Sequence, residues 1–202
     1  MEGLIDLGYV LLGYEDFEFV PSDSCGSQEV FGFRQNSGYF RYIGDFSKII
    51  IPDVIMGNEV MTYHRMFEYD TIVTHVANSY DSQIADLSLM FYRKTAYELN
   101  LEYLTVPNAQ NTSQMFAECR IDSYLYLKGF EGAKIRDMGR MFRDCDIYGL
   151  DLSFVDLSGL SENDIYDLFY GNSYVEKIIA RSKEDKDKLD CLSMGDRFYI
   201  SY

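Results

Sequence analysis

A pair of large hydrophobic residues recurs through the middle of the chain at an almost constant interval. Successive phenylalanines of these pairs are 24, 25, 26 and 27 residues apart, in Met66-Phe67, Met90-Phe91, Met115-Phe116, Met141-Phe142 and Leu168-Phe169. Self-similarity at such a period is typical of repeat proteins. Because one short repeat cannot bury its own apolar face, neighbouring repeats must stack. The pairs are therefore predicted to form continuous core columns.

Each repeat is expected to contain a short helix and then a short strand. Apolar residues at helical spacing, Ile135/Met138/Phe142 and Ile165/Leu168/Phe169, predict one or two helical turns around the pairs. Polar and apolar residues then alternate, most clearly in 97–101, 124–127 and 149–152 and more weakly in 72–76 and 174–179. Period-two alternation indicates strands with one buried face. The expected fold is an α/β repeat, a short solenoid of about five helix-strand units.

Two of the repeats also carry a family resemblance. Residues 135–145 and 150–156 resemble the BspA-type leucine-rich-repeat-like (mycoplasma-lipoprotein-type) repeat, V-T-D-M-S-x-M-F-x-x-C and then L-x-x-L-D-L-S-x-F-D. Residues 111–119 are a second good match, and the resemblance extends from 49 to about 180. In the outer repeats Asp70, Lys94 and Asn172 replace the cysteine. The resemblance implies a leucine-rich-repeat-like solenoid with a binding role, and many of its relatives are bacterial surface proteins.

The two ends of the chain lack the repeat and are predicted to cap the solenoid at 49–180. In residues 1–48, three alternating segments separated by turn clusters indicate an N-terminal β cap with antiparallel strands. Residues 181–202 form the expected C-terminal cap. There, Ser182 can N-cap a last helix with Asp185 at its third position, and residues 197–202 read as a closing strand.

Composition narrows the class of protein and its compartment. A net charge of -15 and a pI near 4.4 argue against direct nucleic-acid binding, which needs a basic surface. The first 14 residues lack an early Lys or Arg, and no apolar run is long enough to span a membrane. The prediction is a cytoplasmic protein, located in the host cell cytoplasm if it is phage-encoded. The four cysteines form no CxxC pair and are expected to be reduced and mostly in the core, namely Cys25, Cys119, Cys145 and Cys191.

No motif of a known catalytic class is present. The two histidines, His64 and His75, have no HExxH or Cys-His pattern around them, and neither a Walker A motif nor a G-x-G-x-x-G occurs. Carboxylate pairs are abundant in so acidic a chain and have little diagnostic value, and no D-x-D-x-D-G calcium loop exists. The expectation is a protein that is not an enzyme, with no cofactor and no metal.

The acidic residues lie in the cap and the repeats, and they suggest a partner. Residues 1–48 carry 8 acidic and 3 basic residues, and residues 49–180 carry 20 and 10. One interpretation is solubility; the other is a surface complementary to a basic protein. Carboxylates beside tyrosines suit recognition of arginine-rich surfaces. The outward-facing strand residues expected to bind the partner are Glu98, Asn100, Glu102, Tyr124, Tyr126 and Asp151.

Two functions are therefore expected as alternatives. The first is a non-enzymatic inhibitor of the phage type, anti-CRISPR-like, that mimics nucleic acid and binds a CRISPR effector or another basic nucleic-acid-binding protein. That link is an analogy from small size, acidity and the N-terminus. The alternative is a bacterial surface module for adhesion or interaction, as the BspA-like resemblance implies. Neither involves a membrane contact of this chain.

Overall fold

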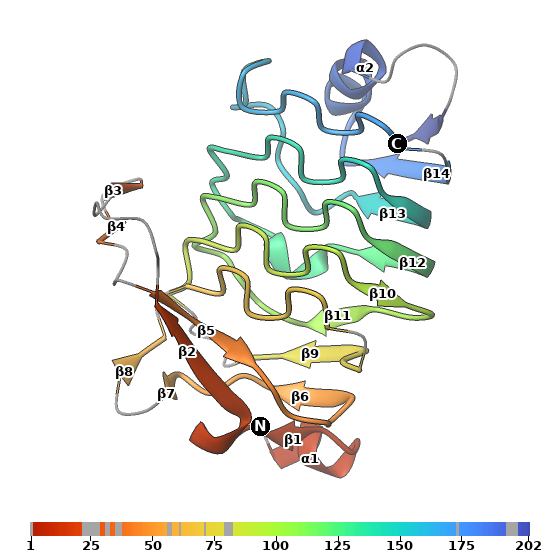
Figure 1. Cartoon of the computed structure of the whole chain (residues 1–202). Helices are drawn as coiled ribbons and strands as arrows, with labels where there is room; N and C mark the ends of the chain where they lie inside the picture. Colours follow the sequence, from red (N-terminus) through yellow and green to blue (C-terminus); the bar gives the residue numbers. More distant parts are fainter. Residues whose placement is uncertain are drawn as a thin grey trace.

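Many of the strands stack one above another along one side of the molecule (Figure 1). In the computed structural model the chain forms a parallel β-solenoid of about five turns. The structure describes residues 2–21, 29–30, 33–34, 38–55, 58–60, 62–70, 72–78, 83–172, 174–192 and 198–202. The stack consists of two parallel sheets. The first contains β1 (Val10–Leu11), β6 (Lys48–Ile50), β9 (His75–Ala77) and β11 (Asn100–Tyr103), and the second contains β10 (Thr95–Ala96), β12 (Arg120–Tyr126), β13 (Asp146–Leu152), β14 (Tyr174–Ala180) and β15 (Tyr199–Ser201).

The predicted alternation of buried and outward residues is present in the main strands. Leu125 and Leu127 are buried on the core side, as are Leu150 and Leu152 one turn later. The residues between them, including Tyr126 and Asp151, are at least partly exposed on the other face. The outward face of the sheet therefore has the side chains that the alternation predicts.

The predicted helical turns around the hydrophobic pairs are wrong, because these segments are successive tight turns. The Ala117 amide donates within its own turn to Gln114 O at 3.1 Å, whereas the Phe116 amide donates to Met141 O of the next turn at 2.9 Å. Every second backbone amide therefore donates to the neighbouring turn of the solenoid. In an α-helix these amides would all donate to carbonyls of the same helix. The alternation requires left-handed backbone at residues such as Arg140 (φ 57°) and Asp144 (φ 53°). Such turns place apolar residues three or four positions apart, which is also the spacing of the buried face of a helix. The sequence pattern therefore predicted helical turns.

The predicted core columns are confirmed. Each Met-Phe pair has 0% exposure, and Leu168 and Phe169 are at 1% and 5%. The rings of Phe67, Phe91, Phe116, Phe142 and Phe169 lie parallel in one stack, with successive centroids 5.5, 5.4, 5.5 and 5.7 Å apart. The stack runs through the solenoid as a continuous hydrophobic centre.

A second column holds the residues at the repeat's cysteine position. Cys119 and Cys145 are buried free thiols, and burial raises the pKa of Cys119 to about 12. In the first turns the same position is taken by Asp70 and Lys94, whose Oδ2 and Nζ are 2.5 Å apart, with Lys94 fully buried. The substitutions away from cysteine thus replace thiols with a buried ion pair. Of the other two cysteines, Cys191 is an exposed free thiol and Cys25 lies outside the described residues.

The ends of the solenoid are covered by different elements. At the N-terminal end, β2 (Phe17–Pro21) pairs with β5 (Gly38–Tyr42) in an antiparallel hairpin, which puts Phe17 and Tyr42 against the core. Sequence reasoning missed α1 (Glu2–Asp6) and the parallel pairing of β1 with β6, which gives the N-terminal segment a strand in the stack. The smaller elements are β3 (Glu29–Val30), β4 (Phe33–Arg34), β7 (Val54–Ile55), β8 (Asn58–Glu59) and the 3-10 turns Tyr14–Asp16 and Lys128–Phe130.

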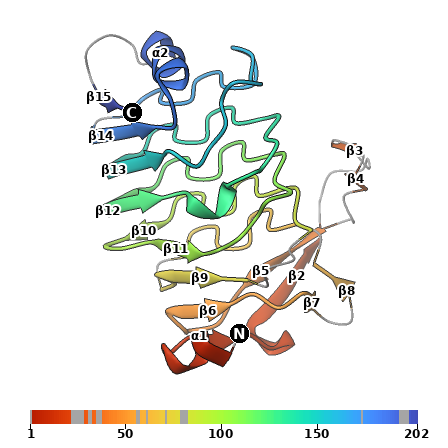
Figure 2. The same cartoon turned by 180° about the vertical axis from the view of Figure 1, so that it is seen from behind.

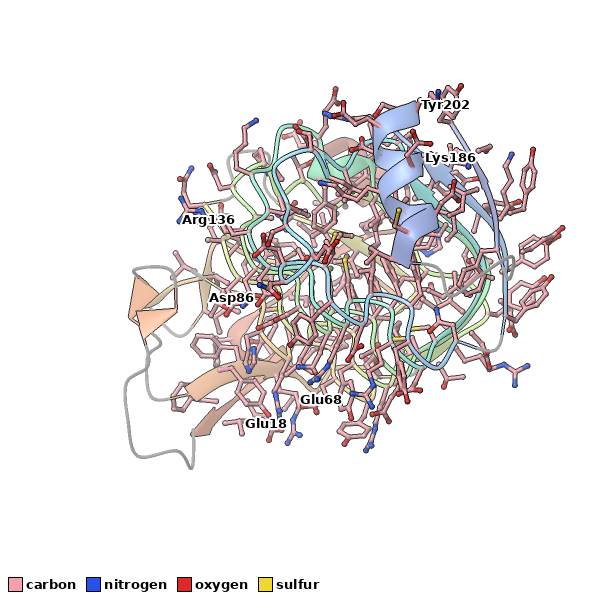
Figure 3. The ribbon with its side chains drawn as sticks, turned by 90° about the horizontal axis from the view of Figure 1, so that it is seen from above. Glu18, Glu68, Asp86, Arg136, Lys186 and Tyr202 are labelled. Atoms are coloured by element: carbon pink, nitrogen blue, oxygen red, sulfur yellow. The ribbon has the colours of Figure 1, made fainter. Side chains whose placement is uncertain are left out.

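At the C-terminal end, α2 (Lys183–Leu192) lies across the last turn of the solenoid (Figure 3). The Asp185 amide donates to Ser182 Oγ at 3.1 Å, so the predicted N-cap is confirmed. Leu189 reaches the core with 0% exposure. The closing strand is β15, which pairs in parallel with β14.

Candidate protein-binding groove

The stack of strands is interrupted at one level, between β11 and β12. β11 pairs with β9, and β12 pairs with β13 and with the short β10, so β11 and β12 belong to different sheets (Figure 2). In place of a backbone ladder, the Leu99 amide donates to Ser123 Oγ at 3.4 Å. A groove of about 460 Å³ opens between the two strands. We refer to it as the β11–β12 groove.

Irregular strand pairing occurs on both sides of this groove. In β11, Asn100 and Tyr103 pair with His75 and Ala77, so β11 has one residue more than β9. In β12, three steps from Ile121 to Tyr124 face two steps in β13. Among the described ladders, register shifts occur in these two. β-Bulges of this kind redirect side chains and are frequent beside functional sites, so the bulges and the groove form one feature.

Aromatic rings and carboxylates make up much of the groove wall. Leu99 and Leu101 of the apolar core form its buried side, with exposures of 1% and 3%. The remaining lining residues are the aromatic Tyr97, Tyr124, Tyr126 and Phe154, the acidic Glu98, Glu102 and Asp122, and the polar or basic Asn100, Ser123 and Lys128. Concave sites of 300–1,000 Å³ with apolar walls and a few polar groups are typical of sites that bind small molecules.

The tyrosines of the groove form an ordered cluster over the sheet. Tyr124 packs against Tyr126 with ring centroids 6.0 Å apart, and against Tyr148 of β13 at 5.3 Å with the rings nearly perpendicular. Gly149 lies beneath Tyr124, because a Cβ there would be 2.2 Å from Tyr124 Cε1. The absence of a side chain at Gly149 therefore lets the Tyr124 ring lie against the sheet.

The carboxylates of the groove are weakly neutralised by the protein itself. The Glu98 carboxylate has His75 as its ion-pair neighbour, with Nε2 3.8 Å from Oε1, but burial lowers the pKa of His75, which is therefore neutral at pH 7. Asp122 contacts Arg120 at 3.4 Å, with both side chains more than half exposed. Such exposed pairs contribute little, and the groove remains negative.

The structure brings together most of the residues that the sequence singled out. Glu98, Asn100, Glu102, Tyr124 and Tyr126 all line the β11–β12 groove. That they bind a partner stays a prediction.

Asp151 is adjacent to the groove but not part of its lining. It pairs in register with Tyr126 from the neighbouring strand β13, and its Oδ1 accepts a hydrogen bond from the Ser153 amide at 2.9 Å. That oxygen is already hydrogen-bonded within a local turn. Asp151 is therefore better placed to add negative charge near the groove than to contact a partner directly.

Sequence reasoning missed Tyr97, Asp122, Ser123 and Phe154. For Asp122 and Ser123 a signal existed: the step between the buried residues Ile121 and Leu125 is four, whereas the equivalent step from Ile147 to Leu150 is three. The extra residue is the bulge. Alternation in 97–101 puts Tyr97 on the buried side with Leu99 and Leu101, but Tyr97 precedes β11 and is 82% exposed. Phe154 lies beyond the end of β13, where strand alternation gives no prediction.

Other kinds of site find no support in the part of the chain that the structure describes. No cluster of three or more His, Cys, Asp or Glu suited to a metal ion occurs among these residues. Neither of the described helices has the length and apolar character needed to cross a membrane. His64 is mostly enclosed, with Nδ1 2.7 Å from Ser88 Oγ, and burial lowers its pKa.

Comparison with known proteins places the chain in a family. Residues 61–181 match the model of a family described as "Mycoplasma protein of unknown function, DUF285". No curated protein and no solved structure matches the chain. The matched segment begins five residues before the first Met-Phe pair in the sequence, ends after β14 and includes the whole β11–β12 groove. Because the match spans more than half of the chain, the protein belongs to the DUF285 family.

Proposed function

We propose that the protein is a non-enzymatic protein-binding module and that the β11–β12 groove binds a basic segment of its partner. The observation that carries the proposal is the coincidence of three features at one level of the solenoid: the break between the sheets, the two bulges and the cluster of tyrosines with carboxylates. In a regular solenoid, backbone hydrogen bonds would join the strands at this level in a continuous ladder. A departure that opens an aromatic groove suits recognition better than stability.

The chemistry of the groove supports a basic partner. Tyrosine supplies large contact area at low entropic cost and is frequent at interaction hot spots. The carboxylates of Glu98, Glu102 and Asp122 give the groove negative charge, in a chain whose net charge is -15. Such a field accelerates association with a positively charged partner.

Two narrower functions use the same chemistry. In the first, the protein acts in the cytoplasm as a phage-type, anti-CRISPR-like inhibitor whose carboxylates occupy the basic groove of a nucleic-acid-handling protein; the acidity supports this one. In the second, it is a surface module for adhesion or interaction; the resemblance of residues 135–156 to the BspA-type repeat supports that one. Both require a basic surface on the partner.

A salt-dependent binding experiment tests the shared part of the proposal. The probe is a labelled twelve-residue peptide that contains both lysine and arginine, titrated at 50 and 300 mM salt. The triple variant Glu98→Lys/Glu102→Lys/Asp122→Lys should lose most of the affinity, chiefly through slower association. Its control reverses three exposed carboxylates outside the groove, Asp6, Glu162 and Asp187.

The outcomes separate the groove from charge alone. The parent protein should bind more weakly at 300 mM salt, because exposed charges are screened within about 10 Å at 0.1 M salt. The control should retain binding to within about twofold after its equal change in net charge. If the two triple variants lose affinity equally, or if neither loses any, the groove is not the binding site.

A competition experiment separates the two narrower functions. An inhibitor should displace a labelled DNA duplex from a basic nucleic-acid-binding protein and should slow target cleavage by a CRISPR effector loaded with guide RNA. An adhesion module should leave both reactions unchanged. Inhibition that persists in the triple variant would contradict the role of the groove in either case.

A further inference from the structure

We infer that the β11–β12 groove selects arginine over lysine and holds a guanidinium of an extended peptide against its tyrosine rings, close to Glu98 and Asp122. This inference rests on the proposed function and names the side chain that the groove reads. Its basis is an arrangement that the protein repeats with its own arginines on the turn side of the solenoid, in the tight turns around the Met-Phe pairs.

The clearest internal example is Arg93. Its guanidinium carbon lies 5.0 Å from the ring centroid of Tyr92 and 5.5 Å from that of Tyr69. Its Nε donates to Glu118 Oε2 at 2.6 Å, and Glu118 also accepts from Tyr92 Oη at 2.7 Å. These hydrogen bonds, the one from Tyr92 first, lower the pKa of Glu118. The site thus consists of tyrosine rings, a carboxylate and one arginine.

Two more arginines show the same combination. Arg140 lies 4.9 Å over the ring of Tyr166 and 3.4 Å from Asp167. Arg143 lies 5.3 Å over Tyr170, and its Nε is 3.0 Å from Asp144. In each case the solenoid brings the arginine to a tyrosine ring of a neighbouring turn, and a carboxylate contacts the same guanidinium. Arginine, tyrosine and acid therefore form a recurrent unit in this protein.

The β11–β12 groove contains the rings and the carboxylates of that unit, but the described residues supply no arginine stacked over them. Tyr124 stacks on Tyr126 and meets Tyr148 edge to face, and no described arginine lies over the ring of Tyr124 or Tyr126. Arg120 contacts the Asp122 carboxylate from an exposed position. The groove is accordingly suited to an arginine that comes from a partner.

Lys128 sets the position of the bound cation within the groove. It follows the end of β12, lines the groove and makes no ion pair with a described residue. Its charge disfavours a second cation at that end. Asp122 lies in β12 and Glu98 just before β11, both nearer the start of these strands than Lys128, and they leave the guanidinium a place next to Tyr124.

Arginine fits this site better than lysine for two physical reasons. A planar guanidinium stacks on an aromatic face and is weakly hydrated, whereas an ammonium is compact and strongly hydrated. A guanidinium also presents several donors in one plane, so it can bond to carboxylates on both strands at once. A lysine gains the same long-range attraction but neither of these contacts.

Three matched peptides test the inference by calorimetry and by NMR titration of the full chain. They share an acetylated Gly-Ser background with two alternating positions occupied by arginine, lysine or citrulline, which is planar but uncharged. The arginine peptide should bind about tenfold more tightly than the lysine peptide. The citrulline peptide should not bind measurably.

Variants then assign the preference to the ring. Tyr124→Ala should reduce arginine binding to the level of lysine, and Tyr124→Phe should retain the preference because the ring face remains. Tyr166→Ala removes a stacked tyrosine on the turn side and should change neither peptide's affinity. Equal affinity for arginine and lysine in the parent would overturn this inference and leave the proposed function standing, whereas binding of neither peptide would overturn both.

Discussion

Replacing Gly149 with alanine should displace the central tyrosine of the groove without unfolding the protein. A Cβ at Gly149 would lie 2.2 Å from Cε1 and 2.5 Å from Cδ1 of Tyr124. Ordinary carbon–carbon contacts are about 3.5–4.0 Å, so the ring must move outward by more than about 1 Å. The backbone of Gly149 is not in the left-handed region, so alanine can adopt it without strain. Alanine also loses less conformational entropy than glycine when the strand forms. The change therefore acts on the ring and not on the fold.

The expected result is a loss of affinity at nearly constant stability. Truncation of an aromatic hot spot costs 2 kcal/mol or more, and a displaced ring that keeps some contacts should cost about 1.4 kcal/mol, or tenfold in Kd. The assay is calorimetric titration with the arginine peptide, together with a thermal melt. The melting temperature should stay within a few degrees of the parent's.

Gly139→Ala is a matched control on the other side of the solenoid. A Cβ at Gly139 would lie 2.3 Å from Tyr166 Cε1, so the same substitution displaces a tyrosine under Arg140. This variant should bind the peptide as the parent does. If Gly149→Ala also binds like the parent while NMR shows that the Tyr124 ring has moved, Tyr124 is not an anchor and the reasoning fails.

Three further predictions concern the core. Phe116→Ala opens a cavity in the ring stack and should cost about 3–5 kcal/mol in free energy of unfolding, measured by chemical denaturation; a parent-like value would contradict a continuous core. Asp70→Ala leaves the buried ammonium of Lys94 unpaired and should cost a similar amount, and adding Lys94→Met should recover most of it; failure of the second change to help would show that the ion pair is not the cause. Burial raises the pKa of Cys119 and Cys145, so both thiols stay protonated in the folded protein at pH values where the unfolded chain ionises. The free energy of unfolding should therefore be unaffected below the unfolded thiol pKa of about 8.5 and should fall above it, by about 2 kcal/mol per thiol at pH 10. Stability measured from pH 7 to 10 should fall less steeply for Cys145→Ala than for the parent, and native thiol labelling should be slow at both residues.

The repeat and its core could be read from the sequence because both depend on spacing. Five hydrophobic pairs recur at intervals near 25 residues. Because one repeat is too short to bury its own pair, the repeats must stack. Leu125, Leu127, Leu150 and Leu152 likewise determine which side of each strand faces the core. These features are set by burial alone, which a hydrophobic pattern records directly.

The tight turns could not be distinguished from helices in this way. In both, apolar residues return every three or four positions, and the difference lies in the direction of alternate amides. The left-handed positions are occupied by residues such as Arg65, Tyr69 and Leu89 rather than by glycine, so the usual sequence signal for such backbone is missing. Hydrogen bonds to the next turn hold these residues in that conformation.

Sequence reasoning predicted many of the outward-facing residues of the candidate site but not the groove between the strands. Alternation placed Glu98, Tyr124 and Tyr126 on the outward face, but nothing in it indicated that the sheet breaks between their strands. Beside the break, β12 has one residue more than β13 between Ile121 and Tyr124, and one inserted residue is easily missed where repeat length already varies.

The most direct test of the central claim is to map the arginine peptide on the full-length, nitrogen-15-labelled protein by NMR. The account predicts shifts of the backbone amides in residues 97–103 and 122–126, on the two strands that border the β11–β12 groove. The turn side of the solenoid around Arg93 and Arg140 should remain unchanged. Shifts concentrated on that turn side or on the β2–β5 hairpin, with the groove amides unmoved, would contradict the claim that this groove is the binding site.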